Sequence, residues 1–283
     1  DAGTTNTTGD SNVAVGYSAL GANNTATGAV AVGANALDAN TTGARNTAVG
    51  QDALGTNTEG NDNVAIGNSA LESNLTGSDN VAIGRVALNA NTASNNIGIG
   101  KDALAANTIG NTNIAIGTDA MTTNVAADRN VAIGEQALQN MTAASTTDTY
   151  NTAVGYNAGL AVNSGSSNTL IGGLSGKAIT TGTSNTMIGK EAGKALVDGD
   201  ENVIIGDGAA QTTTAVHDAV IIGRGAAQNG NITTGANGTV AIGHKALEAL
   251  TSGAKNTAVG YQAGKAMTDG TDCTILGYQA GLA

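Results

Sequence analysis

The sequence predicts an all-β protein whose fold is a parallel β-solenoid of about sixteen coils, each of about 17 residues. Three observations predict this fold. A glycine preceded by an aliphatic residue recurs along the chain, the segment before it is rich in β-forming residues, and Asn-Thr-x-Gly turn chemistry follows it. We call the recurring residues the marker glycines and number positions from them, so that −1 precedes and +1 follows each one. The marker glycines are Gly16, Gly33, Gly50, Gly67, Gly84, Gly100, Gly117, Gly134, Gly155, Gly172, Gly189, Gly206, Gly223, Gly243, Gly260 and Gly277.

The regular spacing of the marker glycines sets the repeat. Twelve of the fifteen intervals between them have the same length as the interval from Gly33 to Gly50, and the first half has the consensus N-x-A-[VI]-G-x-x-A-L-x-x-N-T-x-G-x-x, as in residues 46–60. Recurring Gly and Asn would break helices, and helical repeats are typically longer than about 30 residues. We therefore expect each unit to be one coil with two turns and two short strands, one before the marker glycine and one beginning at Ala-Leu.

Composition excludes an ordinary globular core and several classes of partner. The 283 residues include 42 Gly, five Tyr and no Pro, Phe or Trp, so small aliphatic side chains must fill a thin interior. The net charge of −11 repels nucleic acid and anionic lipid. No apolar run approaches the ~20 residues of a membrane-spanning helix, so we expect no membrane insertion. Cys273 is the only cysteine, which excludes an internal disulfide and a cysteine metal cluster.

Two apolar positions adjoin in the predicted first strand. Position −1 is Val, Ile or Leu in all sixteen coils, and position −2 is nonpolar in all of them. Neighbouring residues of a strand point to opposite faces, so one position faces the interior and the other forms an apolar stripe that another chain would cover. The alternative is a rounder solenoid with its small Ala residues in a turn. The side chains expected to contact another chain are Leu170, Met187, Ile204, Ile221 and Ile275.

Position +7 predicts a polar ladder in the first half of the chain. Stacked amides at a turn can bond one coil to the next, and Asn also tolerates left-handed backbone. The ladder residues are Asn23, Asn40, Asn57, Asn74, Asn91, Asn107 and Asn124.

The domain organisation follows from changes in the repeat. From Met141 onward position +7 is mainly apolar, and Ala-Leu becomes Ala-Gly in several coils. Residues 1–283 are therefore expected to form a single solenoid with two sub-regions, 1–140 with the Asn column and 151–283 with the apolar column. We expect protruding loops at 138–150 and 228–239, because the interval between marker glycines lengthens from Gly134 to Gly155 and again from Gly223 to Gly243.

The repeat motifs resemble those of two families of fibrous proteins. Asn-Val-Ala-Ile-Gly at 63–67, 80–84 and 130–134 resembles the N-[ST]-[VI]-A-[IV]-G signature of trimeric autotransporter adhesin heads, which are left-handed parallel β-rolls. Asn-Thr-Ala-Val-Gly-Tyr-Asn-Ala-Gly at 151–159 and the related motif at 256–264 are similar to repeat tracts of phage tail fibres. The resemblance covers essentially the whole chain and implies a left-handed, three-chain extracellular fibre. A repeat longer than the roughly 14 residues of adhesin heads favours the fibre-like group.

The sequence offers little catalytic chemistry. His217 and His244 are the only histidines, and nothing brings Cys273 to either one, so a nucleophile–base pair is not expected. The acidic clusters at 198–201 and 269–272 are interpreted as solvated loop charges, because they supply too few ligands for a calcium site. We expect no catalytic residue, metal site or cofactor. Four tyrosines that follow marker glycines could serve surface recognition or pack over turns: Tyr17, Tyr156, Tyr261 and Tyr278.

The leading functional hypothesis is a non-catalytic shaft of an extracellular homotrimeric fibre that attaches to a host or surface, most like a phage tail fibre segment. We expect it on a virion or a bacterial cell surface, with copies of itself and a glycan or protein receptor as partners. The alternatives are an autotransporter adhesin head, a self-assembling surface filament and, less favoured, an ice-binding solenoid, whose Thr array Leu75 and Val125 would interrupt. An acyltransferase β-helix fits poorly, because it needs about 18 residues per coil.

The two ends of the sequence carry a separate expectation. Neither shows the polar capping unit that solenoids generally require, and Ala283 falls midway through a coil. We therefore expect further protein at both ends, or end-to-end assembly into a filament.

Overall fold

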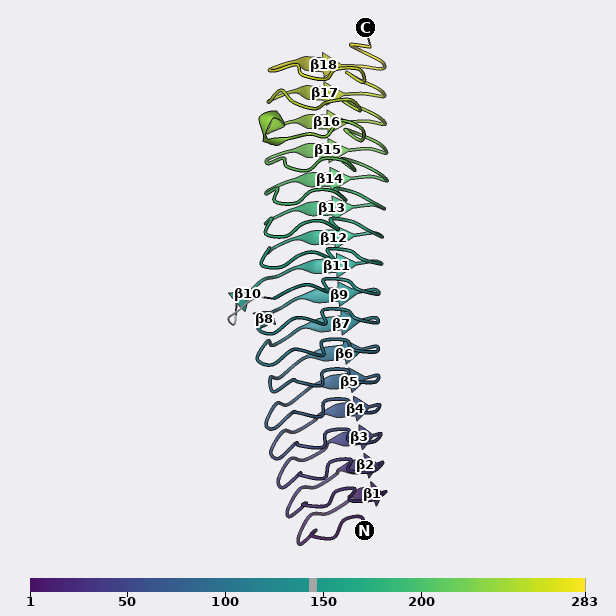
Figure 1. Ribbon diagram of the computed structural model, residues 1–283, viewed down its shortest axis with the longest axis vertical. Coiled ribbons are helices and arrows are strands. Elements are labelled where there is room, and N and C mark those ends of the chain that lie inside the picture. Colours follow the sequence, from purple (N-terminus) through teal and green to yellow (C-terminus); the bar gives the residue numbers. More distant parts are fainter. Residues whose placement is uncertain (143–146, 283) are drawn as a thin grey trace. The chain divides into compact units, whose positions relative to one another are not determined.

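The computed structural model describes residues 1–142 and 147–282. These residues form short strands joined by turns, and their only helical element is the 3₁₀ turn η1 (Thr234–Ala236). The fold is an all-β parallel β-solenoid in which each sequence repeat forms one coil, which confirms the predicted fold class (Figure 1). The chain has two compact units, Asp1–Asp148 and Thr149–Ala283. Part of the loop expected at 138–150, residues 143–146, lies outside the described residues, as does Ala283.

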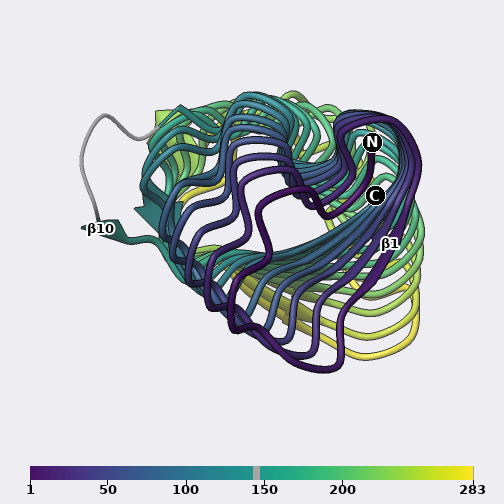
Figure 2. The same ribbon diagram turned by 90° about the horizontal axis from the view of Figure 1, so that it is seen from below.

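The first unit stacks its strands in chain order, each parallel to the next. Equivalent positions of successive coils lie opposite one another, so that Ala48 pairs with Ala65, which pairs with Ala82. A separate parallel pair joins β8 (Ala127–Asp128) to β10 (Thr147–Asp148), and β10 lies away from β1 in the view along the stack (Figure 2). The stacked strands are β1 (Val13–Val15), β2 (Val30–Val32), β3 (Thr47–Val49), β4 (Val64–Ile66), β5 (Val81–Ile83), β6 (Ile97–Ile99), β7 (Ile114–Ile116) and β9 (Val131–Ile133).

The second unit repeats this arrangement with the same register. Met187 pairs with Ile204, which pairs with Ile221. The strands are β11 (Thr152–Val154), β12 (Thr169–Ile171), β13 (Thr186–Ile188), β14 (Val203–Ile205), β15 (Val220–Ile222), β16 (Val240–Ile242), β17 (Thr257–Val259) and β18 (Thr274–Leu276).

Each regular coil contains one strand, and the second strand expected at Ala-Leu is absent from the described coils. The Ala-Leu segment is a turn, because its leucine adopts left-handed backbone: φ is +50° at Leu54 and +54° at Leu71. A β-strand requires negative φ, so the prediction of a second strand was wrong. The turn still bonds coil to coil, since the Leu54 N–H donates to the Ala70 carbonyl at 3.0 Å.

Close contact between coils explains the marker glycines. At Gly50 φ is +138°, and a Cβ there would lie 2.4 Å from the carbonyl oxygen of Gly67. Gly67 has the same relation to Gly84, at 2.5 Å. Any side chain at this position would push adjacent coils apart, and only glycine adopts such backbone without strain.

Much of the interior is filled from positions −2, +3, +4 and +7. In the first unit these are typically Ala, Ala, Leu and Asn, and Ala48, Ala53, Leu54 and Asn57 are all fully buried. In much of the second unit the −2 and +7 side chains are larger and the +4 residue is Gly or Ala. Both units therefore fill the interior, but they distribute its volume differently among the four positions.

Position −2 faces the interior, which corrects the residues expected to contact another chain. Leu170, Met187, Ile204 and Ile221 are fully buried in the single chain, and Ile275 is half-buried. A side chain with no exposed surface cannot contact a second chain. These residues instead fill space left by small residues at +4: a Cβ on Gly193 would lie 2.5 Å from Met187 Sδ.

The insertion at 228–239 is partly built into the core. Ile232 and Ala236 are fully buried. The Thr214 N–H donates to the Ile232 carbonyl at 3.3 Å, and the Thr239 hydroxyl donates to the Ala236 carbonyl at 2.7 Å. The segment expected to protrude is therefore anchored to the unit by two apolar side chains and by hydrogen bonds.

We expect Gly193→Leu to destabilise the second unit, because the new side chain overlaps Met187. Overpacking of this kind typically costs about 1–3 kcal/mol. The variant Met187→Ala removes the obstacle but leaves a cavity, at a cost of about 2–5 kcal/mol.

The double variant Met187→Ala/Gly193→Leu recreates the Ala and Leu pairing of the first unit, where leucine already adopts the φ that Gly193 has (+57°). Chemical denaturation should therefore give a loss in unfolding free energy smaller than the sum of the two single losses. Additive losses would contradict the exchange of volume between these positions.

Candidate interaction surfaces

The outer face of the strands is an aliphatic surface in both units. Positions −3 and −1 flank the buried position −2 and point away from the interior, as in β4 with Val64 and Ile66 and in β5 with Val81 and Ile83. Ile66 is 40% exposed and Ile83 is 36% exposed. Position −1 is aliphatic in every coil, and position −3 is Val, Ile or Thr. We call this surface the outer face.

The outer face is unusual for a parallel sheet. Parallel strands are normally covered on both sides, and soluble monomers rarely expose contiguous apolar patches larger than a few hundred Å². Here the coil covers the inner side alone. The sequence predicted an apolar stripe of this kind, but it assigned position −2 to the stripe, and the structure places positions −1 and −3 there.

The asparagines at +7 are buried in the first unit and bond coil to coil. Asn57 Nδ2 donates to Asn40 Oδ1 at 3.0 Å and to the carbonyl of its own coil's Gly60 at 3.1 Å. Asn74 continues the ladder to Asn57 at 2.9 Å. The ladder is interrupted after Asn23 and after Asn74, whose buried Oδ1 atoms have no partner. The same contacts join Asn107 to Asn91 and Asn124 to Asn107.

A second asparagine ladder, which sequence reasoning missed, occupies position −4. Asn63 donates to Asn46 Oδ1 through both its backbone N–H (2.9 Å) and its side chain (3.1 Å), and Asn80 repeats both contacts to Asn63. The ladder also runs through the second unit, from Asn151 to Asn202. The sequence feature that indicates this ladder is the Asn at the start of the consensus N-x-A-[VI]-G.

The predicted tyrosines fall into two groups. Tyr261 stacks between His244, at a centroid distance of 5.1 Å, and Tyr278, at 5.3 Å. Both ring faces of Tyr261 are therefore occupied, which leaves no face to stack on a sugar. Tyr17 and Tyr156 are exposed, and among the described residues neither has a ring contact.

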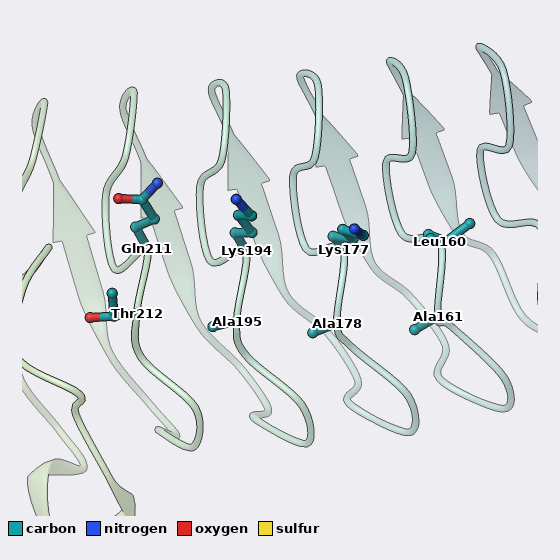
Figure 3. A pocket seen from close by; sticks show the side chains of 8 residues that line it. All are labelled: Leu160, Ala161, Lys177, Ala178, Lys194, Ala195, Gln211 and Thr212. Carbon is teal, nitrogen blue, oxygen red and sulfur yellow. The ribbon is translucent and has the colours of Figure 1, made fainter.

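A groove with a volume of about 680 Å³ lies on the second unit. Two columns of side chains from four successive coils line the groove (Figure 3). The small side chains at position +6 leave room beside the longer side chains at position +5. Sequence reasoning did not identify this groove. Its lining residues are Leu160, Lys177, Lys194 and Gln211 at +5 and Ala161, Ala178, Ala195 and Thr212 at +6.

Charged side chains pair across coils. Arg45 and Asp62 form a two-pronged ion pair at 2.6 Å on the surface, which lowers the pKa of the Asp62 carboxyl. Glu248 is more buried, with 8% of its side chain exposed. Its carboxylate accepts from Lys245 Nζ at 2.9 Å and lies 3.5 Å from Lys265 Nζ. Burial raises the pKa of Glu248, but the two lysines outweigh burial and hold it below the ordinary value of 4.5.

The polar residues weighed for catalysis are dispersed. His217 Nδ1 lies 3.4 Å from Asp200 Oδ2, and the Asp200 carboxylate caps the preceding coil by accepting from the Thr183 N–H at 2.7 Å. Cys273 Sγ contacts the Thr271 carbonyl at 3.5 Å. In the part of the chain that the structure describes, no three His, Cys, Asp or Glu side chains form a metal-binding group. No helix within those residues has the length and apolar character needed to cross a bilayer.

We expect Asn80→Ala to lower the unfolding free energy by at least about 1–3 kcal/mol, because it leaves the buried N–H of Asn96 without an acceptor. Denaturation in urea would measure this loss. Asn68→Ala, at an exposed position in the preceding coil, is the matched control, and its effect should stay within about 0.5 kcal/mol. Equal effects of the two substitutions would argue against the ladder.

Glu248 should make the second unit sensitive to acid. Because its folded pKa lies below the ordinary value of 4.5, its stabilising contribution is present above that pH and is lost as the pH falls through the folded pKa. Unfolding free energies measured from pH 6 to pH 3 should fall less for Glu248→Gln than for the wild type. The variant Glu201→Gln controls for the loss of one carboxylate, and parallel profiles for Glu248→Gln and wild type would contradict the prediction.

Comparison with known proteins adds no family to this description. No protein-family model and no curated protein matches the chain. The likeness to tail fibres and adhesin heads therefore depends on the repeat motif, and the structure adds a parallel β-solenoid that is compatible with a fibre or adhesin shaft.

Proposed function

We propose that the chain is a structural, non-catalytic segment of an extracellular fibre in which three copies associate through their outer faces. The observation that carries this proposal is the aliphatic outer face, which a single chain leaves in contact with water. Ile66, Ile83, Ile133, Ile171 and Ile188 are all between 36% and 40% exposed, and Ile66 and Ile83 lie in neighbouring strands in the middle of the first unit.

The outer face repeats from coil to coil, and this repetition favours association with another copy of the chain over association with a different protein. A surface that presents β-branched or aliphatic side chains at the same two positions of every coil is matched best by another surface with the same coil spacing, and a second copy of the chain has that spacing. Closed symmetric assembly is also the usual outcome for identical chains. Three outer faces turned toward a common axis would cover one another and leave the charged turns in water.

A role in attachment agrees with the remaining surface. The net charge of −11 favours solubility and disfavours nucleic acid as a partner. Exposed tyrosines and the groove of the second unit are available to a receptor on a cell or another surface. The proposed location is a virion tail fibre or a bacterial cell surface, as the repeat motifs suggest.

The proposal is tested by the oligomeric state. Sedimentation of the wild type should give a trimer, and Ile66→Asp/Ile83→Asp should shift it to monomers, because two carboxylates in each chain would be buried without partners. The control Leu75→Asp/Ile109→Asp places the same charges at exposed aliphatic residues outside the strands and should remain trimeric. A wild-type monomer that unfolds cooperatively would overturn the proposal.

A further inference from the structure

A small polar pocket opens on the second unit beside the end of the aromatic stack. Its volume is about 130 Å³, and six residues line it: Asp207, Arg224, Gly225, Gln228, His244 and Lys245. Asp207, Arg224 and His244 occupy position +1 of three successive coils, so the repeat itself brings them together. We call it the cationic pocket.

The cationic groups of the pocket retain unused hydrogen-bonding capacity. Arg224 Nε lies 3.8 Å from Asp207 Oδ2, which is too long for a hydrogen bond, so the planar guanidinium can receive a carboxylate in two-pronged geometry. Lys245 gives one donor to Glu248, and its ammonium group has three. The pocket thus brings two cations and a histidine together in a chain with eleven Lys and Arg residues and a net charge of −11.

The imidazole of His244 is buried on one edge and stacked on one face. Its Nδ1 atom is buried and has no hydrogen-bond partner, and such an atom is costly to leave unpaired. One side of the imidazole is held by the stack on Tyr261, with 14° between the ring planes. The preceding coil contributes Arg224 and Gly225, and Gly225 has no side chain to fill the space. The pocket therefore has a wall formed by an imidazole ring that the aromatic stack holds in place.

The pocket contains both hydrogen-bond donors with positive charge and hydrogen-bond acceptors, and this combination indicates the chemical class of its ligand. Arg224 and Lys245 require acceptors, whereas the Asp207 carboxylate and the Gln228 carbonyl oxygen require donors; the Gln228 amide nitrogen already donates to Gln211 at 3.0 Å. Sulfate has no hydroxyl to give Asp207, and a neutral sugar has no charge for Arg224. The volume corresponds to about four water molecules, enough for a carboxylate and an adjacent hydroxyl group.

From these contacts we infer that the cationic pocket binds the carboxylate end of a hydroxylated acid of the uronic-acid type, with the rest of the ligand outside the pocket. Arg224 and Lys245 hold the carboxylate, Asp207 accepts from a hydroxyl group, and the His244 ring forms part of the wall. The inference goes beyond the structural role proposed above and does not depend on assembly, because one chain supplies all six residues.

The experiment is a titration of the full chain with galacturonate at fixed pH, followed by NMR of the imidazole ring protons. The chain has two histidines, so His244 reports on the pocket and His217 serves as an internal control. We expect saturable shifts of His244 alone and none with galactose. Arg224→Gln should weaken binding about tenfold or more, which is the usual effect of losing a charged hydrogen bond.

The matched control is Arg85→Gln, which removes an arginine at position +1 in the first unit, 3.6 Å from Asp102, and should leave galacturonate binding unchanged. Equally tight binding of sulfate or acetate would overturn the inference in favour of a plain anion site, and tighter binding of a glutamate-rich peptide would overturn it in favour of a peptide site. Equal shifts at both histidines, or no saturable shift, would also overturn it. Sedimentation of the same samples reports separately on assembly.

Discussion

The close approach of successive coils at the marker glycines is the constraint on which the rest of each unit depends. Because a Cβ at Gly50 would meet the carbonyl oxygen of Gly67 at 2.4 Å, the backbones of the two coils are fixed at the spacing of parallel strands. That spacing aligns equivalent side chains one above another. The asparagine ladders, the aromatic stack and the aliphatic outer face all follow from this alignment.

The two units fill the same kind of narrow interior with different side chains. In the first unit, asparagine at +7 lies in the interior, where its amide bonds to its own turn and to a neighbouring coil. In the second unit, aliphatic side chains such as Leu196 occupy that position, and larger residues at −2 fill the space that small +4 residues leave. A buried amide is tolerable because its Nδ2 donates to a carbonyl of its own turn in each of these coils. The asparagine ladder at −4 is common to both units, which marks it as the more general of the two.

Much of the fold was predictable from the sequence, because the period of the marker glycines fixes the number and the order of the coils. The orientation of the strand was not. Positions −1 and −2 are both apolar, and alternation alone does not say which one faces inward; the difference in size between Ala65 and Ile66 was the unused clue. The second strand was predicted wrongly because leucine rarely adopts left-handed backbone, and here coil stacking imposes it on Leu54. The cationic pocket depends on which +1 side chains meet in consecutive coils, which a coil-by-coil alignment of the sequence reveals.

Irregular intervals fall in one part of the coil, and this has a consequence for how such a chain can change in length. The interval that ends at Gly100 is shorter than its neighbours, yet Asn107 still bonds to Asn91 and Asn96 to Asn80, so the turn between the two ladders absorbs the deletion. The longer interval that ends at Gly243 places its additional residues in the same turn, around η1. Gain or loss of a whole coil by gene duplication or recombination would preserve every ladder, whereas fractional changes are accommodated only there. Natural variation in length among chains of this kind should therefore come in whole repeats, and smaller insertions or deletions should fall in this turn.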